Sequence, residues 1–133
     1  MIGALSCGPG QRPSLATLAE QCYASAYQAL DGGDDKNAQR LFALMAVLLP
    51  RDERPWIGLG VARERCEDWR AAAGLYEVGT VLSPSSVWCH FGRARALKRL
   101  GRQQQAETSF DLAEDMAEDE LLVAAICAER NSP

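Results

Sequence analysis

Residues 53–86 have the sequence ERPWIGLGVARERCEDWRAAAGLYEVGTVLSPSS, and several features of this segment return elsewhere in the chain at a fixed spacing of 34. Pro50 and Pro84 share this spacing. A chain rich in alanine produces one such series by chance, but several series in one register indicate a repeated structural unit. The series are Ala26, Gly60 and Ala94; Ala38, Ala72 and Ala106; Phe42, Tyr76 and Phe110; and Met45, Gly79 and Ala113.

The composition predicts that these units are helical. The chain has 21 alanines and 16 leucines against 6 valines, 3 isoleucines and 3 threonines. Alanine and leucine lose little on entering a helix, whereas sheets favour β-branched and aromatic residues. No segment between the breaks at glycine, proline and aspartate shows the strict alternation of an amphipathic strand. The sequence therefore predicts an all-α fold.

A 34-residue unit of two helices is typical of the tetratricopeptide (TPR) repeat. The small residues let paired helices approach closely, the aromatic residue fills the space between them, and the proline ends the second helix. The predicted architecture is an α-solenoid of three TPR helix pairs followed by a C-terminal capping helix. The repeats are 19–52, 53–86 and 87–120, and the cap spans about 119–130.

The predicted domain organisation is simple. Residues 1–13 are expected to form a flexible leader, because Gly8, Pro9, Gly10 and Pro13 break regular structure. Residues 14–130 are expected to form a single TPR domain, which suits a chain of 133 residues.

Charge and hydropathy exclude several classes of protein. The net charge of −4 and the pI near 5.0 argue against a nucleic-acid partner, which needs a basic footprint. No apolar run approaches the ~20 residues of a membrane span, so no membrane insertion is expected. The N-terminus lacks the features of a secretion signal, and the five cysteines are irregularly spaced. These features predict a cytoplasmic location.

The sequence offers little for catalysis. His90 is the single histidine, so neither a histidine-based triad nor a two-histidine metal site exists within one chain. Gly58 and Gly60 belong to no nucleotide-binding motif. We therefore expect no catalytic residue, no cofactor and no metal, and predict that the protein is not an enzyme.

The TPR register predicts a binding groove. In TPR stacks the first helix of each unit lines a concave face through unit positions 2, 5, 9, 12 and 13. These positions make the first two-thirds of the groove apolar and aromatic and its far end basic, and such a groove is typical of a peptide-binding site. By the same register, Phe42, Tyr76 and Phe110 are core residues. The predicted groove residues are Tyr23, Tyr27, Leu30, Ile57, Val61, Trp88, Phe91 and Arg95.

The third repeat is polarised in charge. Basic residues occupy 93–102 without an acid, and acidic residues occupy 107–120 without a base. Two interpretations remain open: the basic stripe pairs with the acidic helix, or it contacts acidic groups of a partner.

The segment RPWIGLGVAR, residues 54–63, resembles a family. The translocator chaperones of type III secretion (class II, the SycD/LcrH group) carry a similar stretch at the start of their second repeat. Residues 18–27, 38–48 and 69–79 are also similar to that family, and the likeness covers roughly 14–117.

The resemblance implies a bacterial cytosolic chaperone that holds an extended hydrophobic segment of a secreted translocator in its concave groove and keeps it soluble before export. The resemblance is also compatible with a homodimer. Two alternatives stay open: a generic TPR adaptor or scaffold, and a chaperone for a needle or filament subunit. The pocket residues that the resemblance implies are Tyr23, Tyr27, Leu30, Phe42, Ile57, Val61, Tyr76 and Phe91.

Overall fold

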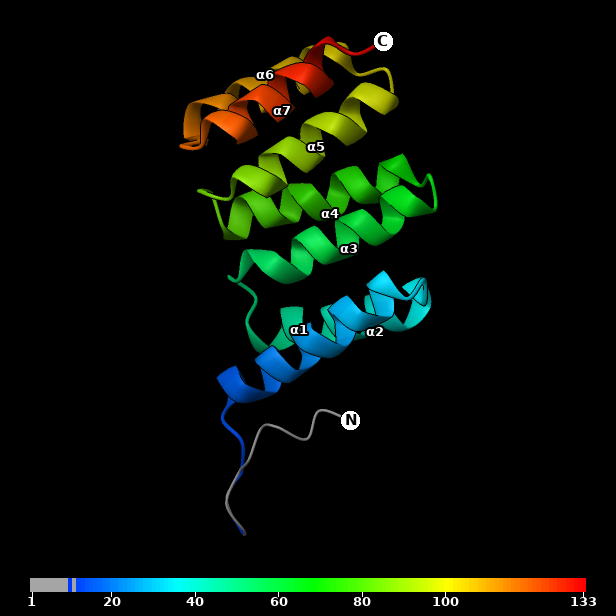
Figure 1. Cartoon of the computed structure of the whole chain (residues 1–133), viewed down its shortest axis with the longest axis vertical. Coiled ribbons are helices and arrows are strands. Elements are labelled where there is room, and N and C mark those ends of the chain that lie inside the picture. The colour runs from blue at the N-terminus through cyan, green and yellow to red at the C-terminus, as the bar shows by residue number, and fades with distance from the viewer. Residues whose placement is uncertain (1–9, 11) are drawn as a thin grey trace.

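The computed structural model describes residue 10 and residues 12–133, which contain seven α-helices and no strand (Figure 1). The predicted all-α fold is confirmed. The predicted leader, residues 1–13, falls mostly outside the described residues. The helices are α1 (Leu15–Asp31), α2 (Asp35–Leu48), α3 (Glu53–Arg65), α4 (Trp69–Leu82), α5 (Val87–Arg99), α6 (Gln103–Met116) and α7 (Glu120–Asn131).

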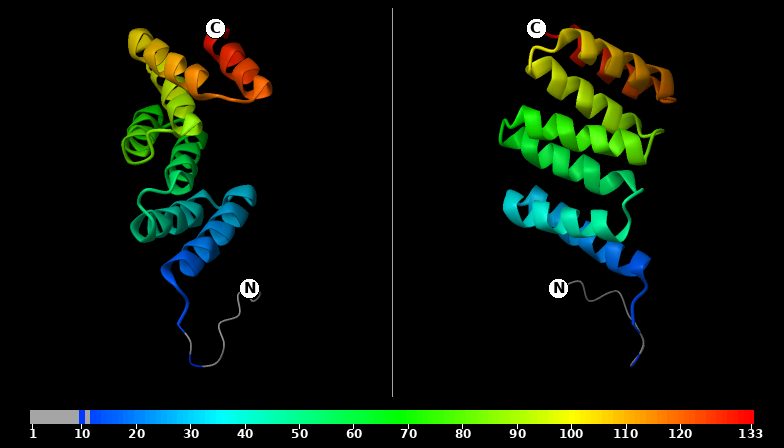
Figure 2. Two further views of the ribbon diagram at one scale, coloured as in Figure 1. Left: turned by 90° about the vertical axis from the view of Figure 1, so that its left-hand side faces the viewer. Right: turned by 180° about the vertical axis from the view of Figure 1, so that it is seen from behind.

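The helices form a stack of three pairs closed by a single helix. Consecutive helices pack as the pairs α1/α2, α3/α4 and α5/α6, and α7 packs against α6 and α5. Helices α2, α4 and α6 lie on one side of the stack, and α1 and α7 project toward the other side (Figure 2). This arrangement is the predicted α-solenoid of three TPR helix pairs with a C-terminal cap.

The turn inside each pair occurs at the same unit position. Gly33 and Gly101 adopt φ angles of 84° and 76°, in the left-handed region that glycine enters without steric cost. The second repeat has Glu67 at this position with a φ of 56°. The repeat therefore imposes this turn geometry, and a residue that carries a Cβ is strained at this position.

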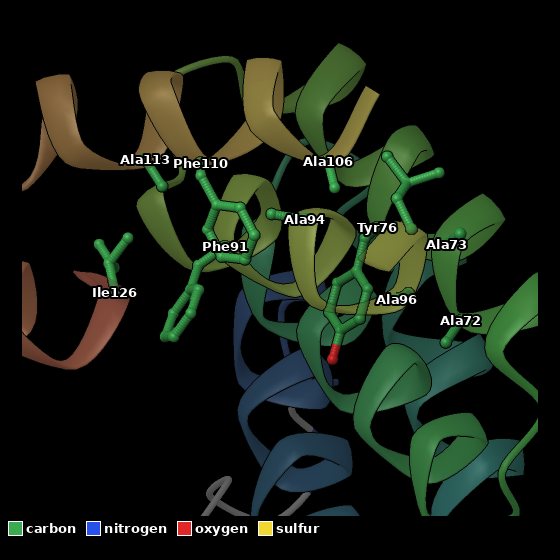
Figure 3. Packing of buried hydrophobic residues seen from close by; sticks show 11 residues of the cluster. Ala72, Ala73, Tyr76, Phe91, Ala94, Ala96, Ala106, Phe110, Ala113 and Ile126 are labelled. Carbon is green, nitrogen blue, oxygen red and sulfur yellow. The ribbon is translucent and has the colours of Figure 1, made fainter. Parts of the chain in front are cut away.

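The core is built on the aromatic series. Phe42, Tyr76 and Phe110 are at most 1% exposed, and Figure 3 shows Tyr76 and Phe110 packed among the small residues of neighbouring helices. A Cβ added at Gly60 or Gly92 would lie 2.4 or 2.5 Å from the Tyr76 ring. The Tyr76 ring thus fills a space that small residues of two successive units leave open, which joins the second repeat to the third.

Candidate functional site

A pocket with a volume of about 340 Å³ lies between α1 and α3. Its walls are mainly apolar and aromatic, because both helices contribute unit positions 5 and 9, which are Tyr23 and Tyr27 in α1 and Ile57 and Val61 in α3. The lining residues are Tyr23, Tyr27, Leu30, Asp31, Phe42, Arg54, Ile57, Gly58, Val61 and Arg65.

Phe42 of α2 closes the base of the pocket. Its ring belongs to the buried core and also lines the cavity, and its centroid lies 6.4 Å from that of Tyr23. A Cβ added at Gly58 would lie 2.4 Å from Cζ of Phe42. The glycine therefore lets the ring abut α3, and this contact sets the depth of the pocket.

Arg54 bounds one end of the pocket. Its Nη2 lies 2.7 Å from Glu20 on α1 and 2.7 Å from Asp52, and its guanidinium lies 4.6 Å from the centre of the Tyr23 ring. Hydrogen bonds from Arg54 lower the pKa of both carboxyl groups. The ion pair ties α1 to α3 and holds Tyr23 in the pocket wall.

Arg65 bounds the opposite end. Its Nη1 donates to the backbone carbonyl of Leu30, 2.5 Å away, and to Oδ1 of Asp35, 3.1 Å away. The carbonyl belongs to the last turn of α1, where backbone acceptors lack intrahelical donors. Two arginines thus span the gap between α1 and α3 and leave an apolar opening between them.

The structure brings six of the predicted groove residues together around this pocket: Tyr23, Tyr27, Leu30, Phe42, Ile57 and Val61. Tyr27 is 57% exposed, so much of its ring is available at the rim. Arg54, Arg65 and Asp31 also line the pocket, and they lie at unit positions 2 and 13, which the TPR register places on the concave face. The role of Gly58 depends on a contact with another repeat, and no periodic pattern shows it.

The other four predicted residues lie around the next gap, between α3 and α5. Tyr76 and Phe91 are 1% and 6% exposed and belong to the core, whereas Trp88 is 50% exposed and lies beside Phe91. The guanidinium of Arg95 lies 4.8 Å from the centre of the Phe91 ring. This gap therefore exposes one large aromatic side chain, Trp88, and buries the two others.

A partly buried polar network closes the second gap. Arg95 Nη2 lies 2.7 Å from Oε1 of Glu64, and the Tyr76 hydroxyl donates to the same oxygen at 2.6 Å. Burial and the charge of Glu64 raise the pKa of Tyr76, so its hydroxyl stays protonated. In the first gap, the positions of Glu64 and Arg95 are occupied by Leu30 and Val61. The same repeat geometry thus yields an apolar pocket in one gap and an ion pair in the next.

The basic stripe of the third repeat is bound mainly to α3, α4 and α7. Arg95 binds Glu64 of α3, and Arg99 lies over the Trp69 ring of α4. Lys98 donates to the backbone carbonyls of Glu129 and Ser132, both 2.5 Å away, and so caps α7.

The acidic residues of α6 bind a different arginine. Arg130 of α7 pairs with Glu107, with Asp111 at 2.7 Å and with Glu114 at 3.2 Å. Within the described residues, no ion pair joins the stripe 93–102 to the acidic run 107–120. The polarised charge of the third repeat thus fastens α7 to the stack.

The fold and the pocket together define a class: a three-repeat TPR solenoid with an apolar, aromatic-walled pocket between its first two repeats. No protein-family model matches the chain. Low calcium response locus protein H of Yersinia pestis is 27% identical over 100 residues, covering 75% of this chain and 60% of that protein. The chain thus spans less than two-thirds of the length of this curated relative.

Solved structures give a similar picture. The type III secretion translocator chaperone SycD of Yersinia enterocolitica matches with a TM-score of 0.79 and 26% identity, covering 88% of this chain and 90% of that chain. PcrH of Pseudomonas aeruginosa matches with a TM-score of 0.80 and 26% identity, covering 93% and 96%. PcrH in complex with the chaperone-binding region of PopD matches with a TM-score of 0.79 and 26% identity, covering 91% and 93%. The resemblance to translocator chaperones that the sequence indicates is confirmed.

Two further observations concern other functions. None of the helices in the described part of the chain is both long and apolar enough for a membrane span. Among residue 10 and residues 12–133, histidine, cysteine, aspartate and glutamate side chains form no group of three suited to a metal ion.

Proposed function

We propose that this chain is a cytoplasmic, non-catalytic chaperone of a bacterial type III secretion system. It binds an extended hydrophobic segment of a secreted translocator in its concave groove and keeps that protein soluble before export. The observation that carries the proposal is the apolar pocket between α1 and α3, which six predicted groove residues line. The similarity to PcrH, which has been solved with the chaperone-binding region of PopD, supports the same conclusion.

The pocket binds its client mainly through side chains. The main-chain amides and carbonyls of α1 and α3 are largely used within the helices, so they offer few hydrogen bonds to a client backbone. An aliphatic client side chain that enters the pocket contacts Tyr23, Phe42 and Ile57 and gains about 1.5–3 kcal/mol from its burial. A short segment with one or two such side chains therefore needs further contacts, which Tyr27 and Trp88 offer as exposed aromatic rings.

The proposal includes the domain organisation. Residues 14–130 act as one TPR domain, with repeats at 19–52, 53–86 and 87–120. The proposal is compatible with a homodimer of the free chaperone. Client binding uses the gap between the first two repeats, so the first repeat is required for activity although it matches the TPR pattern less well than the second.

Co-purification of the chain with the translocators encoded beside its gene tests the function. The wild-type chain is expected to keep a translocator soluble, and the variant Val61→Asp, which places a charge in the pocket wall, is expected to release it. Val81→Asp on α4 is the matched control, because Val81 is 71% exposed and lies outside the pocket. Circular dichroism confirms that both variants fold. A translocator equally soluble without the chain, or equal binding by both variants, contradicts the proposal.

A further inference from the structure

A second cleft, with a volume of about 370 Å³, lies between α4, α5 and the start of α6. Its lining residues come from α4, α5, the turn after α5 and the first turn of α6, whereas those of the pocket described above come from α1, α2 and α3. Its base is apolar and its rim is polar. The lining residues are Arg70, Ala73, Gly74, Glu77, Arg93, Leu97, Leu100, Arg102 and Gln105.

The rim of this cleft is strongly basic. Three guanidinium groups, those of Arg70, Arg93 and Arg102, face one carboxylate, Glu77, although the chain as a whole has a net charge of −4. Arg93 is partly buried; it donates to Oγ of Ser109 at 3.1 Å and lies 3.8 Å from Glu77. Arg70 and Arg102 form no ion pair with any described residue. The cleft thus concentrates positive charge that the described part of the chain does not neutralise.

Comparison between repeats shows that this charge is particular to the cleft. The residue 34 positions before Arg102 is Asp68, which lies 3.8 Å from Arg63 and forms an ion pair within its own repeat. In the third repeat the acid is replaced by arginine and Arg63 by Leu97, so this internal pair is lost. Gly74 also replaces the arginine of the first repeat, Arg40, and no heavy atom lies within 4 Å of where its Cβ would be. These replacements remove an acid and a side chain, and they leave the cleft open and basic.

We propose that this arginine cleft, formed by Arg70, Arg93 and Arg102, is a docking site for an acidic peptide segment of a partner protein. Arginine binds carboxylates through a planar pair of N–H donors, and three such groups around one cavity suit a glutamate or aspartate side chain. Leu100 at the base is only partly buried and supplies an apolar contact for the aliphatic part of the segment, while Leu97 beside it belongs to the core. A free inorganic anion would use the guanidinium groups but not this apolar base.

Docking at the arginine cleft does not depend on the groove. The two cavities share no lining residue. A partner bound through its acidic segment can therefore remain attached while the pocket between α1 and α3 is filled or empty. Charge complementarity of this kind speeds association and depends on ionic strength, so docking weakens as salt is added.

Chemical-shift titration of the full, ¹⁵N-labelled chain tests the proposal. The probe is a hexaglutamate peptide, and hexaglutamine at the same ionic strength is its control. Hexaglutamate alone is expected to shift the backbone amides of residues 70–77 and 97–105. The double variant Arg70→Gln/Arg102→Gln is expected to bind hexaglutamate about fivefold more weakly or worse.

Two matched variants make the test specific. Lys36→Gln/Arg40→Gln removes the same number of positive charges from α2 of the first repeat, outside the cleft, and its affinity for hexaglutamate is expected to stay within about twofold of wild type. R102D restores the acid that the first two repeats carry, and it is expected to abolish the shifts while the chain stays folded.

The proposal is overturned if hexaglutamate shifts no amide in these two segments, or if the two double variants lose equal affinity. It is also overturned if R102D binds hexaglutamate as wild type does. Inorganic phosphate is the third arm: shifts as large as those of the peptide at equal anionic charge would show a general anion site and overturn peptide docking.

Discussion

The contact between Gly58 and Phe42 predicts that Gly58→Ala destabilises the protein and obstructs its pocket. The added methyl group would lie 2.4 to 2.5 Å from three atoms of the Phe42 ring, far inside van der Waals contact. Phe42 is 1% exposed and packs in one core cluster with Ala26, Ala38 and Leu59, so we expect the ring to shift toward the cavity that it lines. Overpacking of this kind costs about 1–3 kcal/mol.

Gly74→Ala is the matched control for this substitution. Gly74 occupies the sixth residue of α4, as Gly58 does in α3, but its Cβ would meet no heavy atom within 4 Å. Both variants gain about 1 kcal/mol in helix propensity, so the difference between them isolates the clash. Gly74→Ala is expected to be more stable than wild type, and Gly58→Ala less stable than Gly74→Ala by about 1–3 kcal/mol.

Urea denaturation followed by circular dichroism measures both free energies of unfolding, and calorimetry measures the affinity of each variant for the translocator segment. Gly58→Ala is expected to bind more weakly because the displaced ring occupies part of the pocket. If both variants are stabilised equally, the ring moves freely, and the account of the pocket base is refuted.

Three further predictions concern stability. Tyr76→Phe keeps the ring but removes the hydroxyl that donates to Glu64 at 2.6 Å, so urea denaturation is expected to show a loss of about 1.5–3 kcal/mol; a loss below about 0.5 kcal/mol would contradict the network. Glu67→Gly removes the steric strain of a side chain at a left-handed φ, so thermal denaturation is expected to show a gain in stability of up to about 1 kcal/mol; a clear loss would show that the side chain has another role. Arg54 lowers the pKa of Asp52 and of Glu20. The stability that these two ion pairs add to the folded chain is therefore fully present above the ordinary carboxyl pKa, about 4, and is lost as the pH falls through the lowered values. Thermal melts of Arg54→Gln are expected to depend less on pH than those of wild type, and parallel curves would contradict the assignment.

The sequence predicts the fold well because the fold follows from periodicity. The aromatic series Phe42, Tyr76 and Phe110 identifies one core position per repeat, and the structure buries all three. Gly60 of the second repeat and Gly92 of the third both leave room for the Tyr76 ring, so this ring packs one repeat against the next. Local signals therefore agree with the tertiary arrangement throughout the stack.

The site is less predictable because it depends on what differs between repeats. Position alone gives Leu30 and Val61 the same place in the first gap that Glu64 and Arg95 have in the second. Whether a gap is an open apolar pocket or a closed polar bridge is decided by the pair of side chains that meet across it, 2.7 Å apart in the case of the ion pair. Tyr76 shows the consequence: it shares the position of Phe42, but its hydroxyl is drawn into the ion pair.

The most direct test of the central claim is to locate the client's side chains in a complex with the translocator segment. Isotope-edited nuclear Overhauser spectra report which methyl groups of this chain lie within a few ångströms of the client's apolar side chains. The account predicts contacts to the methyl groups of Ile57 and Val61 in the pocket between α1 and α3. A stable complex whose client contacts Val47 and Val81, which are the most exposed aliphatic residues of α2 and α4, and leaves Ile57 and Val61 unperturbed would contradict it.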